Sequence, residues 1–116
     1  MTTIEFYNRI GQDYAEVLDR MTGSEAFVKR FLKRFCEDST YAALSEAVSG
    51  GDVESIFRQA HTLKGVSANL GLKPLFEKTC VLVEITRNGG SEGIREAFDE
   101  ITSAYQEVIA LIHLVE

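Results

Sequence analysis

His61 and the residues just after it are the part of the sequence best suited to chemistry. Lys64 follows three residues later and Gly65 four residues later, within the run AHTLKGVSANLG. A neutral imidazole is a nucleophile near pH 7, because the ordinary imidazole pKa of roughly 6.5 leaves one ring nitrogen unprotonated. Its attack on phosphorus forms a phosphoramidate, and a lysine ammonium can offset the charge of the phosphoryl group. These residue types fit phosphoryl transfer.

The segment 52–70 is predicted to be a helix that turns His61 away from the protein core. At about 100° per residue, an arc of mostly apolar residues falls opposite the histidine. This predicted core face consists of Ile56, Ala60, Leu63, Val66, Ser67 and Leu70. Gly71 is a suitable stop for the helix, because glycine readily adopts the left-handed conformation.

The outer face of this helix surrounds His61 with a small set of residues. Gly65 leaves the helix surface bare, so a phosphoryl donor can approach closely. A glycine inside a helix costs about 1 kcal/mol relative to alanine, which suggests a functional reason for it. The other neighbours of the predicted site are Phe57, Arg58, Lys64, Ala68 and Asn69.

Helical spacing of apolar residues runs through the chain, and no alternating strand pattern competes with it. The sequence predicts one all-α domain, 1–116, with an antiparallel up-down four-helix bundle. We expect the bundle helices at 39–49, 52–70, 73–88 and 92–115, so its core spans about 39–115. Short N-terminal helices are expected within about 3–36, as a piece at 3–20 and a helix at 24–36. Ser24, Ser39 or Thr40, and Asp52 are the expected helix caps.

Composition excludes several classes of function. The net charge of −6 argues against nucleic acid as the main partner, because phosphate binding needs clustered lysine and arginine. No stretch reaches the roughly 18 apolar residues that a membrane span needs, and no signal peptide is visible. The two cysteines are expected to be reduced thiols of a cytoplasmic protein. The initial Met1 and the helix at the C-terminus favour a free-standing protein, expected to be a monomer.

The run around His61 resembles the phosphorylation-site motif of histidine-containing phosphotransfer (HPt) domains, roughly H-x-L-K-G-x-x-x-x-x-G. The residues that fit this pattern are His61, Leu63, Lys64, Gly65 and Gly71. The similarity extends over about 25–115, with Ile56, Ala60, Leu75 and Leu82 at positions where the family has core apolar residues.

This resemblance implies a phosphorelay intermediate. His61 would accept a phosphoryl group, through Nε2, from a phospho-aspartate of a response-regulator receiver domain and pass it to another receiver aspartate. A hybrid sensor histidine kinase is one candidate source of such a receiver. The receiver would supply Mg²⁺ and most catalytic groups, so this chain needs no cofactor. Since no glycine-rich ATP lid or P-loop is present, we expect a phosphocarrier without kinase activity.

The resemblance also implies a docking surface and reveals one departure. Receivers bind such domains through an apolar patch, here Phe57 and Ala68, with Arg58 and Lys64 at its rim and Asn69 beside it. Alternatively, Phe57 is partly covered by the N-terminal helices. Family members often carry Glu or Gln, which can orient the site imidazole, where this chain has Val83. The group that orients His61 is therefore open.

Two other functions fit the sequence less well. A degenerate HPt fold could serve as an adaptor without phosphotransfer, but the intact set of His61, Lys64 and Gly65 argues against it. A metal site inside a helical bundle usually needs several His and carboxylate ligands on facing helices. This chain has only two histidines, and His61 is predicted to face outward while His113 lies near the C-terminus. We expect no metal site.

Overall fold

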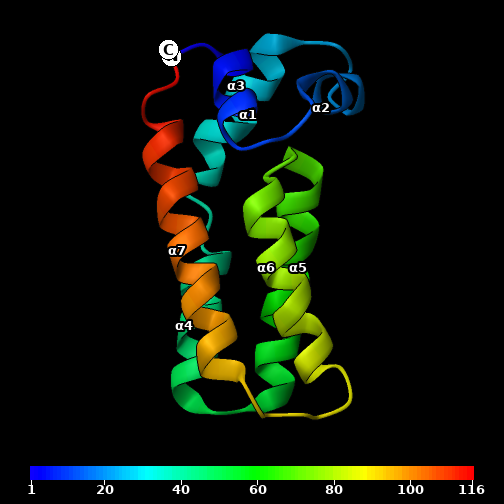
Figure 1. Ribbon diagram of the computed structural model, residues 1–116, viewed down its shortest axis with the longest axis vertical. Helices are drawn as coiled ribbons and strands as arrows, with labels where there is room; N and C mark the ends of the chain where they lie inside the picture. Colours follow the sequence, from blue (N-terminus) through cyan, green and yellow to red (C-terminus); the bar gives the residue numbers. More distant parts are fainter.

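The computed structural model describes all 116 residues and contains α-helices and no strand (Figure 1). In Figure 1, α4 and α6 run down the molecule while α5 and α7 run up it, which makes an antiparallel up-down bundle. The predicted all-α bundle fold is confirmed. The helices are α1 Thr3–Arg9, α2 Tyr14–Arg20, α3 Glu25–Phe35, α4 Thr40–Gly50, α5 Val53–Leu70, α6 Lys73–Thr86 and α7 Ile94–Ile112.

Several helix ends follow from local sequence signals. The Ser24 hydroxyl accepts a hydrogen bond from the Phe27 amide at 3.2 Å and caps the start of α3, as predicted. Gly71 ends α5 in the left-handed conformation, with φ of +67°. Pro74 lies in the first turn of α6, where its missing N–H has no partner to lose. These signals set the short turn that makes α5 and α6 antiparallel neighbours.

The predicted helices differ from the structure in two details. The piece expected at 3–20 is divided, because Gly11 adopts a φ of +74° and the Asp13 carboxylate then caps α2 by accepting from the Ala15 amide. Ser39 and Asp52 stand at the N-cap positions of α4 and α5, as expected, but neither side chain caps a backbone amide. The Asp38 carboxylate accepts from the Thr40 amide, and the Asp52 side chain accepts from the Ser55 hydroxyl instead of a backbone amide.

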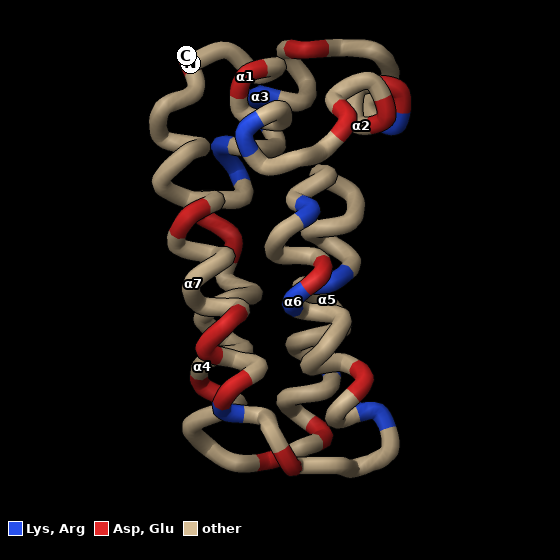
Figure 2. Tube along the Cα trace, in the orientation of Figure 1, with Lys and Arg blue, Asp and Glu red and all other residues tan.

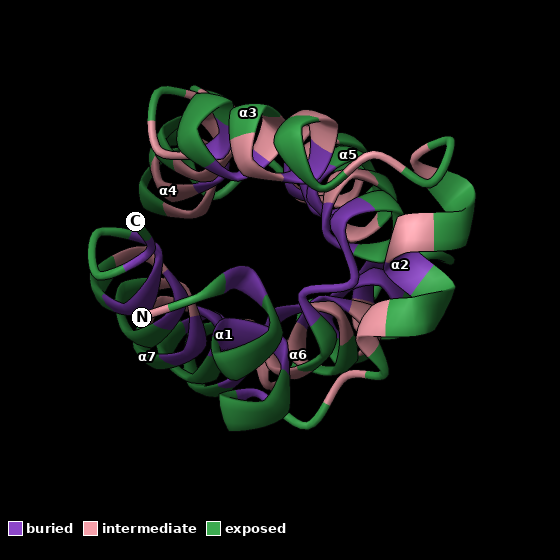
Figure 3. Cartoon of the chain, turned by 90° about the horizontal axis from the view of Figure 1, so that it is seen from above, coloured by how far each residue is buried: buried purple, intermediate pink, exposed green.

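The core runs along the bundle axis. Viewed from above, the buried residues face the centre of the helix ring and the exposed residues lie outside (Figure 3). The buried apolar side chains form one cluster of 24 residues. Between α4 and α7, the rings of Tyr41 and Tyr105 stack with centroids 4.0 Å apart. Burial of apolar surface is the main force that holds the helices together.

The N-terminal helices cover the end of the bundle where α5 stops and α6 starts (Figure 1). The buried Tyr7 hydroxyl donates a hydrogen bond of 2.7 Å to the carbonyl oxygen of Leu70. Gly71 is packed so closely that an added Cβ would overlap Cγ2 of Val17. The last carbonyl groups of a helix lack hydrogen-bond partners inside the helix. Tyr7 supplies a partner for one of these groups in α5.

Charge is distributed unevenly over this fold (Figure 2). Acidic residues occur along α7 and at the end of the bundle away from α1–α3, but also on α1 and α2. The basic residues of α3 are Lys29, Arg30, Lys33 and Arg34, and none of them belongs to an ion pair of the structure. Both cysteines, Cys36 and Cys80, are free thiols. No helix has the length and apolar character that crossing a membrane requires.

Candidate functional site

Helix α5 presents His61 to solvent and buries the opposite side. The imidazole is exposed, while Ile56, Ala60, Leu63, Ser67 and Leu70 of the predicted core face are buried. Val66, also predicted to be in the core, is only half-buried, because it lies at the edge of this arc. The buried Ser67 hydroxyl is satisfied within the helix, since it donates to the carbonyl oxygens of Leu63 at 2.8 Å and Lys64 at 3.0 Å.

The imidazole of His61 forms no hydrogen bond or ion pair within the chain. Its nearest aromatic neighbour is the half-buried Phe57, one turn earlier on α5. The two ring centroids are 5.8 Å apart and the rings are inclined by 40°. Both ring nitrogens are therefore free for a reaction partner, and the Phe57 ring lies beside the imidazole.

Lys64 and Gly65 lie on the same outer side of α5, one turn after His61. The Lys64 side chain is half-buried, and no carboxylate pairs with its ammonium group. Gly65 is exposed, and a Cβ added there would meet no atom within 4 Å. The space above Gly65 is open, so a partner could approach the backbone closely at this turn.

The four residues predicted to bind a partner surround this centre on α5. Phe57 is half-buried, whereas Arg58, Ala68 and Asn69 are exposed. The Arg58 guanidinium donates to the Ser55 hydroxyl at 3.2 Å and lies 3.9 Å from the Glu54 carboxylate. These neighbours hold the Arg58 side chain along α5, at the margin of the site.

The Phe57 ring lies beside a residue at the end of α6. The Arg87 guanidinium, directly after α6, lies 5.9 Å from the centroid of the Phe57 ring. The hydrogen bonds from α1 and α2 to α5 are made to Leu70 and Ala68. These contacts lie at the opposite end of α5 from Phe57, and its partial covering by the N-terminal helices stays a prediction.

Val83 offers the imidazole no polar group. Its side chain is fully buried and aliphatic. Glu84, the next residue, is exposed, and its carboxylate accepts from the Arg87 side chain at 3.0 Å and 3.3 Å. The departure noted in the sequence thus leaves His61 without a hydrogen-bonding partner on α6.

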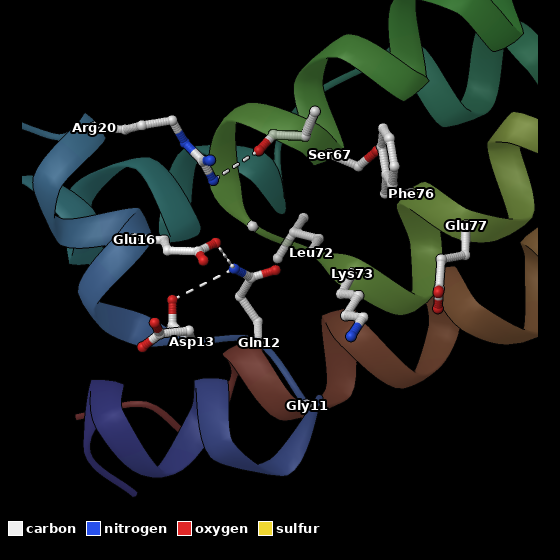
Figure 4. A pocket seen from close by; sticks show the side chains of 12 residues that line it. Gly11, Gln12, Asp13, Glu16, Arg20, Ser67, Leu72, Lys73, Phe76 and Glu77 are labelled. Carbon is white, nitrogen blue, oxygen red and sulfur yellow. Dashed lines mark hydrogen bonds between the residues drawn. The ribbon is translucent and has the colours of Figure 1, made fainter.

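The sequence did not reveal that α2 borders the site. The Arg20 guanidinium donates a hydrogen bond of 3.0 Å to the Ala68 carbonyl oxygen, two turns beyond His61. Figure 4 shows Arg20 above a cleft of about 480 Å³ between the α1–α2 connection and the α5–α6 turn. Charged side chains of both signs line it, including Asp13, Glu16 and Lys73. No local signal in the sequence links α2 to this turn.

A second groove, of about 600 Å³, lies on the other flank of α5, against α2 and α3. Its lining includes Phe27, Phe31, Val66 and Asn69. Asn69 therefore belongs both to the outer side of α5 and to the edge of this groove. No group of three or more His, Cys, Asp or Glu side chains is arranged to hold a metal ion.

Comparison with known proteins gives one match. The family model of the Hpt domain matches residues 30–111 of the 116 residues, from the middle of α3 to the end of α7. No curated protein and no solved structure matches the chain.

Proposed function

This chain belongs to the Hpt domain family, and from that premise we propose that His61 is its phosphoacceptor. Hpt domains are phosphocarriers, not kinases; they act in two-component relays and interact with receiver domains. We propose that this one accepts the group from a receiver phospho-aspartate and passes it to another receiver aspartate. The observation that carries the proposal is the exposed imidazole on α5, with both ring nitrogens free of hydrogen bonds.

Each transfer forms one bond to phosphorus and breaks another. The Nε2 lone pair attacks the phosphoryl group, the bond from phosphorus to the aspartyl oxygen breaks, and the aspartate leaves as a carboxylate. In the second transfer the carboxylate of another receiver attacks, and the P–N bond breaks. The Mg²⁺ for both steps would be held by the receiver, and the chain would use neither ATP nor a cofactor of its own.

Lys64 and Gly65 would serve the same step in different ways. The unpaired Lys64 ammonium would offset the charge on the phosphoryl group held at His61, as cationic groups do in other phosphoryl transfers. The open surface at Gly65 would admit the edge of the receiver that carries the aspartate. The chain would thus contribute an acceptor, a charge and access, and the receiver the remaining groups.

The docking surface would extend along α5 on both sides of His61. Phe57 and Ala68 would form its apolar part, with Arg58 and Asn69 at the margin. A transient signalling interface buries less than about 1,200 Å² in total, which a patch of this extent can provide. The chain would act as a monomer, because one exposed site per molecule suffices for a carrier.

The decisive experiment follows labelled phosphate. Purified receiver domains, phosphorylated with radiolabelled acetyl phosphate, are mixed with the protein, and the label transferred to this chain is measured. We expect labelling of the parent chain and of His113→Gln, the matched control at the other exposed histidine, but none of His61→Gln. The circular dichroism of His61→Gln should equal that of the parent, because the side chain is exposed. A folded protein that no receiver labels would instead be an adaptor.

A further inference from the structure

The orientation of the His61 ring is controlled by something other than a hydrogen bond from α6. Phe57 lies level with Arg87, and Ala68 shares a cleft with Phe76. Because α5 and α6 are antiparallel (Figure 1), this register places Val83 level with His61. Val83 is fully buried and has no side-chain donor or acceptor. The position from which α6 could hold the imidazole is therefore apolar.

The ring of Phe57 occupies the space beside the imidazole instead. Residues four apart on a helix are neighbours, and long side chains in helices point toward the N-terminal turn. The Phe57 and His61 centroids are 5.8 Å apart, within the range of aromatic pairs. Phe57 is half-buried against the core cluster, so its ring has less freedom than an exposed side chain.

Arg87 in turn restrains Phe57. Its guanidinium lies 5.9 Å from the Phe57 centroid, which is a cation–π distance. The Glu84 carboxylate accepts from both Nε and Nη2 of Arg87, at 3.3 Å and 3.0 Å. Because two nitrogens of the planar Arg87 guanidinium are hydrogen-bonded, the orientation of its plane over the Phe57 ring is restrained.

We propose that Phe57 is the positioning residue of the His61 imidazole, and that Arg87 acts on the same ring through Phe57. This inference rests on the proposed function, in which the nucleophilic nitrogen must line up with the bond that breaks at phosphorus. An imidazole free to rotate presents its lone pair in that direction for only part of the time. The aromatic contact replaces, in this chain, the restraint that a polar side chain at position 83 would provide.

The test uses a phosphoryl donor too small to need a docking surface. Phosphoramidate transfers its phosphoryl group to imidazole: the P–N bond of the donor breaks, a new bond forms from Nε2 to phosphorus, and ammonia leaves with the imidazole proton. We expect Phe57→Ala to slow labelling of His61 about fivefold and Arg87→Ala about threefold, in line with typical aromatic and cation–π contacts. Phe57→Tyr, which keeps the ring, should stay within about twofold of the parent.

A matched control separates this effect from a general loss of charge. Arg95→Ala removes an exposed arginine that pairs with Asp99 at 3.8 Å within α7. Its labelling rate should equal that of the parent. Urea unfolding of each variant shows whether it is folded under the conditions of the assay, and every rate is compared among folded proteins only.

The combined variant decides whether Arg87 acts through Phe57. If it does, Arg87→Ala has no further effect once Phe57 is alanine, so the two changes are not additive. Additive changes would mean that Arg87 acts on the phosphoryl group directly, and would overturn its role in positioning. Arg87→Lys, which keeps a cation, should recover part of the rate.

An independent measurement concerns the ring itself and needs no reaction. NMR of the unphosphorylated protein reports the side-chain torsion of His61 and nuclear Overhauser contacts between its ring and that of Phe57. We expect one dominant rotamer in the parent and averaged rotamers in Phe57→Ala. Averaging already in the parent would overturn the inference. A parent chain that shows one rotamer but is never labelled at His61 would count against the proposed function alone.

Discussion

Gly65→Ala is expected to stabilise the protein and to impair phosphoryl transfer. Gly65 lies inside α5, and a Cβ added to it meets no atom within 4 Å. Alanine is favoured over glycine inside a helix by about 1 kcal/mol, so the free energy of unfolding should rise by about that amount. The new methyl group stands one turn from His61, where the receiver would approach. An extra methyl group in a closely packed contact costs about 1–3 kcal/mol. The same cost at the contact with the receiver would slow transfer by roughly tenfold or more.

Two assays on the same preparation check this prediction. Urea unfolding followed by circular dichroism gives the free energy of unfolding, and label transfer from a phosphorylated receiver gives the rate. Gly50→Ala is the matched control, because Gly50 is also helical with open space at its Cβ but belongs to α4. That variant should gain stability and keep the parent rate. An unchanged rate in Gly65→Ala would refute the view that close approach requires the glycine, and a loss of stability would contradict the open space.

Three further predictions concern the support of the site. Gly71→Ala should lower the free energy of unfolding, measured in urea, by about 3 kcal/mol, because the position combines a left-handed backbone with an overlap at Val17. Gly51→Ala is the control: its backbone is also left-handed but the space at its Cβ is open, so it should lose about 1 kcal/mol. Equal losses would show that Val17 moves aside. Lys64→Ala should slow label transfer about tenfold without abolishing it, because only charge compensation is lost, and it should leave the midpoint of urea unfolding unchanged. An unchanged rate of transfer would show that Lys64 is not part of the site. Burial raises the pKa of Tyr7, so the folded protein keeps a proton that the unfolded chain loses above about pH 10, and stability should fall as pH rises beyond that value. Tyr7→Phe should lose about 1 kcal/mol at pH 7 but show a weaker alkaline decline; identical pH profiles would contradict this.

The fold was predictable where the signals are local. The spacing of apolar residues located the four bundle helices to within about three residues of their observed ends, and Gly71 and Pro74 marked the turn between α5 and α6. The wheel through His61 depends only on the helical period, so the outward direction of the imidazole was predictable too. The division of 3–20 was not predictable from spacing, because apolar residues continue at helical intervals across Gly11, whose positive φ appears only in the structure.

The sequence by itself determined an all-α bundle with one histidine on the outer face of α5, because helical period and glycine stops are read within a few residues along the chain. Only the tertiary structure decided what surrounds that face. Arg20 reaches Ala68 across 48 residues, and Tyr7 reaches Leu70 across 63. Arg87 meets Phe57 only because α5 and α6 pack side by side in one register. Such contacts depend on how distant helices approach one another, and no spacing within a single helix encodes that approach.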